Sequence, residues 1–123
     1  MDGRPVPSPD EDGAAARFRV DIRPGEPSVI TVSGDTDLDS TGPLREAVLA
    51  ALDRHQDLVF DLAGVAFADS SFLNVLLLAR SAALERKGSV RLYNAGSQVR
   101  RLLDVTGAAA LFPALSPEQS KQP

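Results

Sequence analysis

The sequence predicts an α/β domain whose sheet is mixed and partly parallel and is covered by helices. Segments with the period or apolar run of β-strands alternate with segments whose apolar residues recur every three or four positions. Strands that alternate with helices usually run parallel in one sheet, whereas two strands joined by a short turn pair antiparallel. With 123 residues the chain has the size of one domain. The expected order is strand, strand, helix, strand, helix, strand, helix.

The first two strands are expected to form a hairpin. Residues 17–23 place Phe18, Val20 and Ile22 on one face and charged residues on the other, which is the pattern of a half-buried strand. Proline and glycine at residues 24–27 supply a turn. Residues 28–33 then predict the second strand, and a loop is expected over residues 34–42.

The first helix and the third strand follow this loop. Pro43 suits the first turn of a helix. The apolar residues that follow fall on one helical face and predict an amphipathic helix; they are Leu44, Ala47, Val48, Ala51 and Leu52. The run 58–62 is too short for a helix and apolar on both faces, as expected of an inner strand.

The second helix is predicted over about residues 70–87, with Gly88 after a basic last turn. Its first half is apolar nearly all round, so a neighbouring helix or a partner is expected to cover part of it. Residues 90–93 predict a further strand. Val99, Leu102 and Leu103 then mark a last helix that ends at Gly107.

The two ends of the chain differ in composition from this domain. Residues 1–15 contain three prolines, two glycines and a short acidic run, which predicts a disordered extension. The domain is expected over residues 16–115, and residues 116–123 are expected to be a flexible tail. No basic segment followed by an apolar one marks a secretory signal, and no apolar run is long enough to cross a bilayer, so a cytoplasmic location without membrane association is expected.

Composition excludes several classes of function. The net charge of -4 argues against nucleic-acid binding, which needs a clustered basic face. There is no cysteine, and the single histidine, His55, is expected on the surface near the end of the first helix. A hydrolytic triad or zinc site therefore has no visible residues, and no glycine-rich loop could cradle a nucleotide. We expect no enzyme activity, no cofactor and no metal.

The junction between the third strand and the second helix carries the strongest functional signal. Asp69 and Ser70 are residue types that cap helices, because their oxygens accept from the free N–H groups of the first turn. A phosphate placed there would be favoured by the helix dipole. Such a cap is also ordinary between any strand and helix. The cap alone therefore does not decide whether these residues only stabilise the helix or also form a functional site.

The segment Leu58–Ala79 around this junction resembles the phosphorylatable segment of the STAS domain, the family of anti-sigma factor antagonists. Residues 30–38 resemble the second strand and acidic loop of that family, and residues 97–107 with Leu111 and Phe112 resemble its closing helix. The resemblance covers about residues 16–115 and implies a single domain with a mixed sheet of about four or five strands and about four helices. The usual pattern has glycines where this chain has Phe72 and Asn74.

The resemblance points to Ser70 as the phosphate acceptor, with Ser71 as the alternative. It also implies a partner-binding surface around this turn and the acidic loop, composed of Asp35, Thr36, Asp37, Asp69, Ser71, Phe72 and Asn74. A calcium loop is a competing reading of the acidic residues. Its carboxylates have the right spacing at Asp35, Asp37, Asp39 and Glu46, but Ser40 replaces the required glycine.

The resemblance implies a binding module that is switched by phosphorylation. The unphosphorylated form would bind an anti-sigma factor that is a serine kinase of the GHKL type, and so release the sigma factor. The kinase would phosphorylate the antagonist, and a separate phosphatase would restore it. Two alternatives remain. One is a non-switching STAS scaffold in a transport or signalling assembly, which a bulky Phe72 ring at the kinase site would favour. The other is a small phosphotransfer or nucleotide-hydrolysing enzyme, for which this chain lacks a phosphate loop or base.

Overall fold

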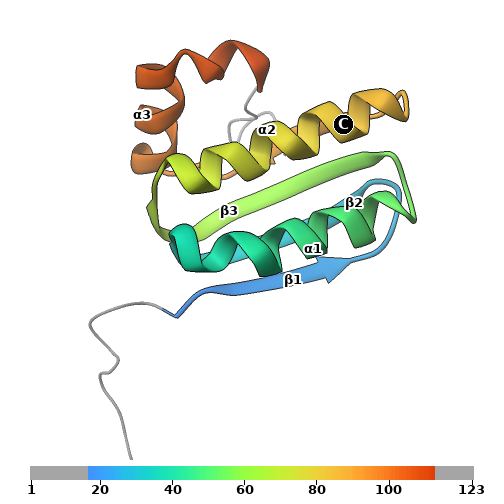
Figure 1. Cartoon of the computed structure of the whole chain (residues 1–123), viewed down its shortest axis with the longest axis horizontal. Helices are drawn as coiled ribbons and strands as arrows, with labels where there is room; N and C mark the ends of the chain where they lie inside the picture. The colour runs from blue at the N-terminus through green and yellow to red at the C-terminus, as the bar shows by residue number, and fades with distance from the viewer. Residues whose placement is uncertain (1–16, 113–123) are drawn as a thin grey trace, which may run out of the picture.

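Four strands form one sheet, and two helices lie side by side over one of its faces (Figure 1). The computed structural model describes residues 17–112. The predicted extension over residues 1–15 and the predicted tail over residues 116–123 lie outside these residues. The strands are β1 (Arg19–Arg23), β2 (Ser28–Thr36), β3 (Asp57–Ala68) and β4 (Ser89–Tyr93); the helices are α1 (Thr41–Leu52), α2 (Ser70–Glu85) and α3 (Ser97–Thr106), with short 3₁₀ helices η1 (Leu38–Ser40) and η2 (Ala108–Leu111).

The topology follows from the lengths of the connections. The strand order is β1-β2-β3-β4; β1 pairs with β2 antiparallel through a short turn, in which the Ser28 hydroxyl donates to the Gly25 carbonyl at 3.4 Å. β3 pairs in parallel with both β2 and β4, and the two crossovers contain α1 and α2. Crossovers of one hand between successive neighbours place both helices on the same face. The predicted α/β fold is confirmed, with four strands, three α-helices and two 3₁₀ helices in the described residues.

The core lies between the sheet and these two helices. Alternate residues of β2 point into it, as do Leu58, Phe60 and Leu62 in the first half of β3. α1 contributes the apolar stripe predicted from its spacing. α2 contributes a second stripe, which consists of Phe72, Leu73, Val75, Leu76, Ala79 and Ala83. A fully buried aliphatic or phenyl side chain contributes about 1.5 to 3 kcal/mol. Among the described residues this layer therefore holds most of the apolar burial that stabilises the fold.

Two strands continue beyond their predicted ends. β2 was expected to stop at Ser33 and β3 at Leu62, but they pair as far as Thr36 and Ala68. Gly34 has a φ of 84° and lies between two irregularities in the register, so the strand bends there without ending. The extra residues of β3 are mostly small and exposed. Because they are held by backbone pairing, they leave no apolar pattern in the sequence from which the longer strand could be predicted.

Substitution of Gly34 tests how far the fold depends on this bend. A Cβ atom at Gly34 would collide with the backbone carbonyl of Arg17, and its φ disfavours any side chain. We expect Gly34→Ala to lower the free energy of unfolding by more than about 1 kcal/mol. Gly42→Ala is the matched control, because nothing lies within 4 Å of the corresponding Cβ in α1; alanine should stabilise that helix by about 0.5 to 1 kcal/mol. Urea unfolding measures both, and equal effects would contradict the assigned role of Gly34.

Candidate functional site

The parallel pairing of β2 and β3 brings the predicted functional segments to one edge of the sheet. Thr36 and Ala68 are register partners at the carboxyl ends of the two strands. η1 follows β2 directly and α2 follows β3 directly, and these two elements contact each other. Figure 1 shows the first turns of α1 and α2 at the same end of the sheet, with α3 beside the start of α2. Segments about thirty residues apart in the chain thus share one surface.

Asp69 caps α2 as predicted. Its backbone is extended, and one carboxylate oxygen, Oδ1, accepts from the backbone N–H groups of Ser71 at 2.9 Å and of Phe72 at 3.4 Å. The backbone carbonyl of Asp69 accepts from Leu73, which closes the first turn of the helix. Two of the donors that would make the start of α2 attractive to an anion are therefore already engaged by a carboxylate of the chain itself.

The two candidate serines differ in exposure. Ser70 is the first residue of α2 and is exposed, whereas Ser71 is half-buried. A kinase must reach the acceptor oxygen with its active site, so accessibility favours Ser70. Asn74, one turn further along the helix, is also exposed and lies on the outer side of α2.

The structure corrects the expected roles of Thr36 and Phe72 as contact residues. Thr36 is fully buried, and its hydroxyl donates to the Phe67 carbonyl at 2.7 Å, which joins the ends of β2 and β3. The Phe72 ring is 1% exposed and belongs to the stripe of α2 that faces the core. Both residues lie in the segments that the resemblance indicated, but helical and strand periodicity turns their side chains inward. The Phe72 ring therefore cannot obstruct a kinase at Ser70.

The acidic residues surround this edge. Asp35 belongs to β2 rather than to a loop and is the register partner of Phe67 in β3. Asp37 caps η1, since its Oδ1 accepts from the Asp39 N–H at 3.1 Å. Asp35 and Asp37 are half-buried, and Asp39 is exposed. Within residues 17–112, no group of three or more acidic or histidine side chains is arranged to hold a metal ion.

Gln98 supports the site and was missed from the sequence. Its side-chain carbonyl accepts from the Ala68 N–H at 2.9 Å, directly before the capping residue Asp69. Gln98 lies in the first turn of α3, which contacts both β3 and α2. The interaction ties α3 to the end of β3. No local pattern indicates it, because the two residues are thirty positions apart in the chain.

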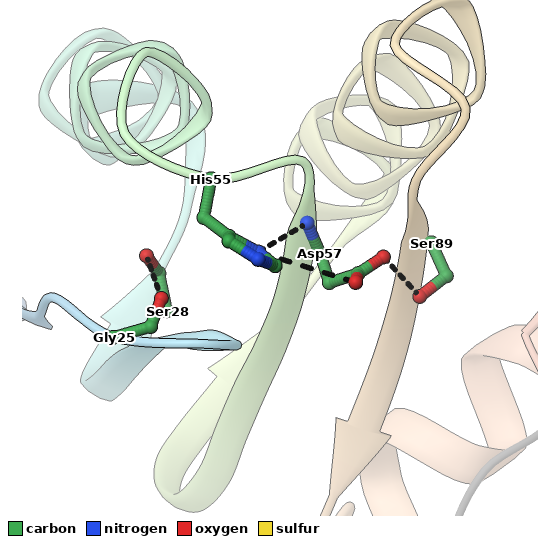
Figure 2. Close-up of polar contacts among 5 residues, drawn as sticks. All are labelled: Gly25, Ser28, His55, Asp57 and Ser89. Atoms are coloured by element: carbon green, nitrogen blue, oxygen red, sulfur yellow. Dashed lines mark hydrogen bonds and ion pairs between the residues drawn. The ribbon is translucent and has the colours of Figure 1, made fainter.

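A second polar cluster lies at the opposite, amino-terminal end of the parallel strands and contains a histidine, an aspartate and a serine (Figure 2). Asp57 is at its centre: the Ser89 hydroxyl donates to its carboxylate at 3.0 Å, and its backbone N–H donates to His55 Nδ1 at 3.0 Å. In a hydrolytic triad the base must contact the nucleophile, whereas here the aspartate separates the two. His55 lies just past the end of α1, near where it was expected, and its Nδ1 accepts from the Asp57 N–H.

Comparison with known proteins identifies the family. A family model described as "Mlab, STAS domain" matches residues 19–113. The chain belongs to the STAS domain family. Over 91 residues it is 29% identical to the anti-sigma-B factor antagonist of Bacillus subtilis (strain 168), a match that covers 73% of this chain and 84% of that protein.

Solved structures share this fold. An anti-sigma factor antagonist from Mycobacterium paratuberculosis superposes with a TM-score of 0.68 at 27% identity, covering 82% of this chain and 86% of that one. The Bacillus cell fate determinant SpoIIAA in its phosphorylated form superposes with a TM-score of 0.65 at 18% identity, covering 85% and 96%. The anti-sigma factor antagonists among these relatives are regulators rather than enzymes, in agreement with the prediction that this STAS protein is not an enzyme. No helix within residues 17–112 has the length and apolar character needed to span a bilayer.

Removal of the Asp69 carboxylate tests the cap. Asp69→Ala leaves the N–H groups of Ser71 and Phe72 without their acceptor, and we expect a loss of about 0.5 to 2 kcal/mol in the free energy of unfolding. Asp69→Asn keeps an acceptor oxygen and should lose much less. Chemical denaturation of both variants measures the difference. An Asp69→Ala variant as stable as the wild type would show that the cap contributes nothing to the fold.

Proposed function

We propose that this STAS protein is an anti-sigma factor antagonist controlled by phosphorylation of Ser70. The unphosphorylated form binds an anti-sigma factor that is a GHKL-type serine kinase, and the sigma factor is released. The kinase then phosphorylates Ser70 and the complex dissociates, and a separate phosphatase restores the binding form. The observation that carries the proposal is an exposed serine at the first position of α2, at an edge that also carries Asp35 and Asp37.

The electrostatics at Ser70 explain how a phosphate would act. A phosphoserine carries about -1.5 to -2 charges near neutral pH. Asp69 already occupies the N–H groups of Ser71 and Phe72, so the phosphate finds these donors engaged and a carboxylate beside it. When a partner covers this surface, the phosphate must be desolvated beside the negative charge of Asp69. Such juxtapositions can cost several kcal/mol, which corresponds to a hundredfold or greater loss of affinity, on the order of magnitude that a switch requires.

The relatives support this proposal. The B. subtilis relative is named as an antagonist of an anti-sigma factor, and SpoIIAA, which shares the fold, has been solved in a phosphorylated form. The main argument for a non-switching scaffold was obstruction by the Phe72 ring. Since that ring is buried in the core, the surface around Ser70 is free of it, and the switching function is preferred.

Substitution of Ser70 tests the switch. Ser70→Ala should abolish phosphate incorporation by the cognate kinase and retain binding, because it removes the acceptor and adds no charge. Ser70→Asp should fold normally, since a carboxylate is favoured at a helix N-terminus, and should bind about a hundredfold more weakly. Radiolabelled phosphate transfer and isothermal titration calorimetry measure the two properties.

Ser71→Ala is the matched control for this series. It should be phosphorylated like the wild type, since its half-buried hydroxyl is not the proposed acceptor. If Ser71→Ala instead loses phosphate incorporation while Ser70→Ala keeps it, the acceptor is Ser71. If neither variant changes phosphorylation or binding, the scaffold reading replaces the switch.

Asp37 tests the contribution of the acidic edge to recognition. Asp37→Lys should slow association with the kinase roughly tenfold, because the charge that attracts a basic partner surface is reversed. Asp37→Asn separates charge from structure, since an amide oxygen can still accept from the Asp39 N–H. We expect Asp37→Asn to show a smaller loss of association rate at an unchanged melting temperature, measured by stopped-flow and thermal unfolding. A lowered melting temperature with unchanged association would make Asp37 purely structural.

A further inference from the structure

Leu38 is an exposed leucine in η1, the short helix that contacts α2. Its side chain is 71% exposed, whereas the leucines of the adjoining helix α1 that face the sheet are buried. A single exposed leucine is ordinary on a protein surface, so exposure by itself indicates nothing. Two further features make this leucine a candidate contact residue: the hydrogen-bonded turn that holds it and the contact between η1 and α2.

The backbone on both sides of Leu38 is fixed by hydrogen bonds. Before it, the Asp37 carbonyl accepts from both the hydroxyl and the N–H of Ser40, at 2.7 and 3.0 Å. Its own carbonyl accepts from the Thr41 hydroxyl at 2.9 Å, and Asp37 Oδ1 accepts from Asp39. Ser40 is buried beneath the turn. The leucine is therefore presented on a rigid 3₁₀ turn, so binding it costs little backbone entropy.

The position of the turn relates Leu38 to Ser70. η1 contacts α2, and the strand that leads into η1 pairs with β3 up to Ala68, two residues before Ser70. Carboxylates adjoin the leucine in sequence on both sides, from Asp37 and Asp39, and Asp69 lies at the end of the neighbouring strand. An apolar side chain flanked by acidic residues fits an apolar pocket with a basic rim. Protein interfaces commonly combine a central apolar anchor with a charged periphery.

We propose that Leu38 is the apolar anchor of the partner interface and inserts into an apolar pocket on the anti-sigma factor kinase, whose rim carries arginine or lysine side chains facing Asp37 and Asp39. This inference rests on the proposed function and adds the chemistry of the partner surface. In this arrangement the leucine supplies affinity that phosphorylation leaves intact. The phosphate on Ser70 opposes that affinity from the neighbouring turn.

The test measures binding between the full chain and its GHKL-type kinase. The kinase is first purified from the source cell by affinity to immobilised wild-type protein. Leu38→Ala should weaken binding at least about tenfold, since most of the apolar side chain that is buried on binding is removed. Val105→Ala is the matched control, because Val105 is 76% exposed but lies on α3. Its affinity should stay within twofold of the wild type. Both variants should keep the wild-type melting temperature, since neither side chain is buried.

The outcomes separate this inference from the proposed function. If Leu38→Ala binds like the wild type, or if it and Val105→Ala weaken binding equally, the anchor role is overturned while Ser70 phosphorylation still supports the switch. A lowered melting temperature for Leu38→Ala would overturn the anchor role in favour of a structural one. If immobilised wild-type protein retains no GHKL-type kinase, or if the retained kinase does not phosphorylate the wild-type chain, the proposed function fails. Selective loss of affinity in Leu38→Ala, with phosphorylation of the wild type at Ser70, supports both.

Discussion

The parallel pairing of β2 with β3 determines where everything else in the molecule lies. Because both strands run in the same direction and end as register partners at Thr36 and Ala68, the segments that follow them emerge together. The hydroxyl of Thr36 reinforces this end by donating across to Phe67. If the pairing stopped at the predicted strand ends, Ser33 and Leu62, the residues that follow would be unpaired and would not hold η1 next to the start of α2. The pairing thus makes one surface from two distant segments of sequence.

The sequence was sufficient for the architecture because the architecture depends on periodicity. The alternation in β1, the stripe of α1, the cap at Asp69 and the stop at Gly107 all follow from local preferences, and the structure has each of them. The ends of β2 and β3 could not be predicted. Their last residues are held by backbone hydrogen bonds between strands, which require no particular side chains.

The candidate site was predictable to the level of segments but not of side chains. Family resemblance indicated the turn at Asp69 and the acidic residues near Asp37, yet it included Thr36 and Phe72, which are buried. The direction of a side chain depends on which face of the element meets the core, and for Phe72 the helical stripe decides this. The role of Gln98 could not be predicted, since its hydrogen bond to Ala68 depends on the packing of α3 against the end of β3.

The cap formed by Asp69 has a consequence for the reverse reaction of the proposed cycle. A phosphate at an uncapped helix N-terminus would accept hydrogen bonds from the backbone N–H groups, and a phosphatase would have to compete with these bonds. Here Asp69 accepts from the N–H groups of Ser71 and Phe72, so a phosphoryl group on the exposed Ser70 would find these two donors engaged. In the proposed cycle, the same carboxylate that caps the helix would therefore leave the phosphoryl group accessible to a phosphatase. The lifetime of the phosphorylated form would then be set by the amount of phosphatase rather than by protection from the fold.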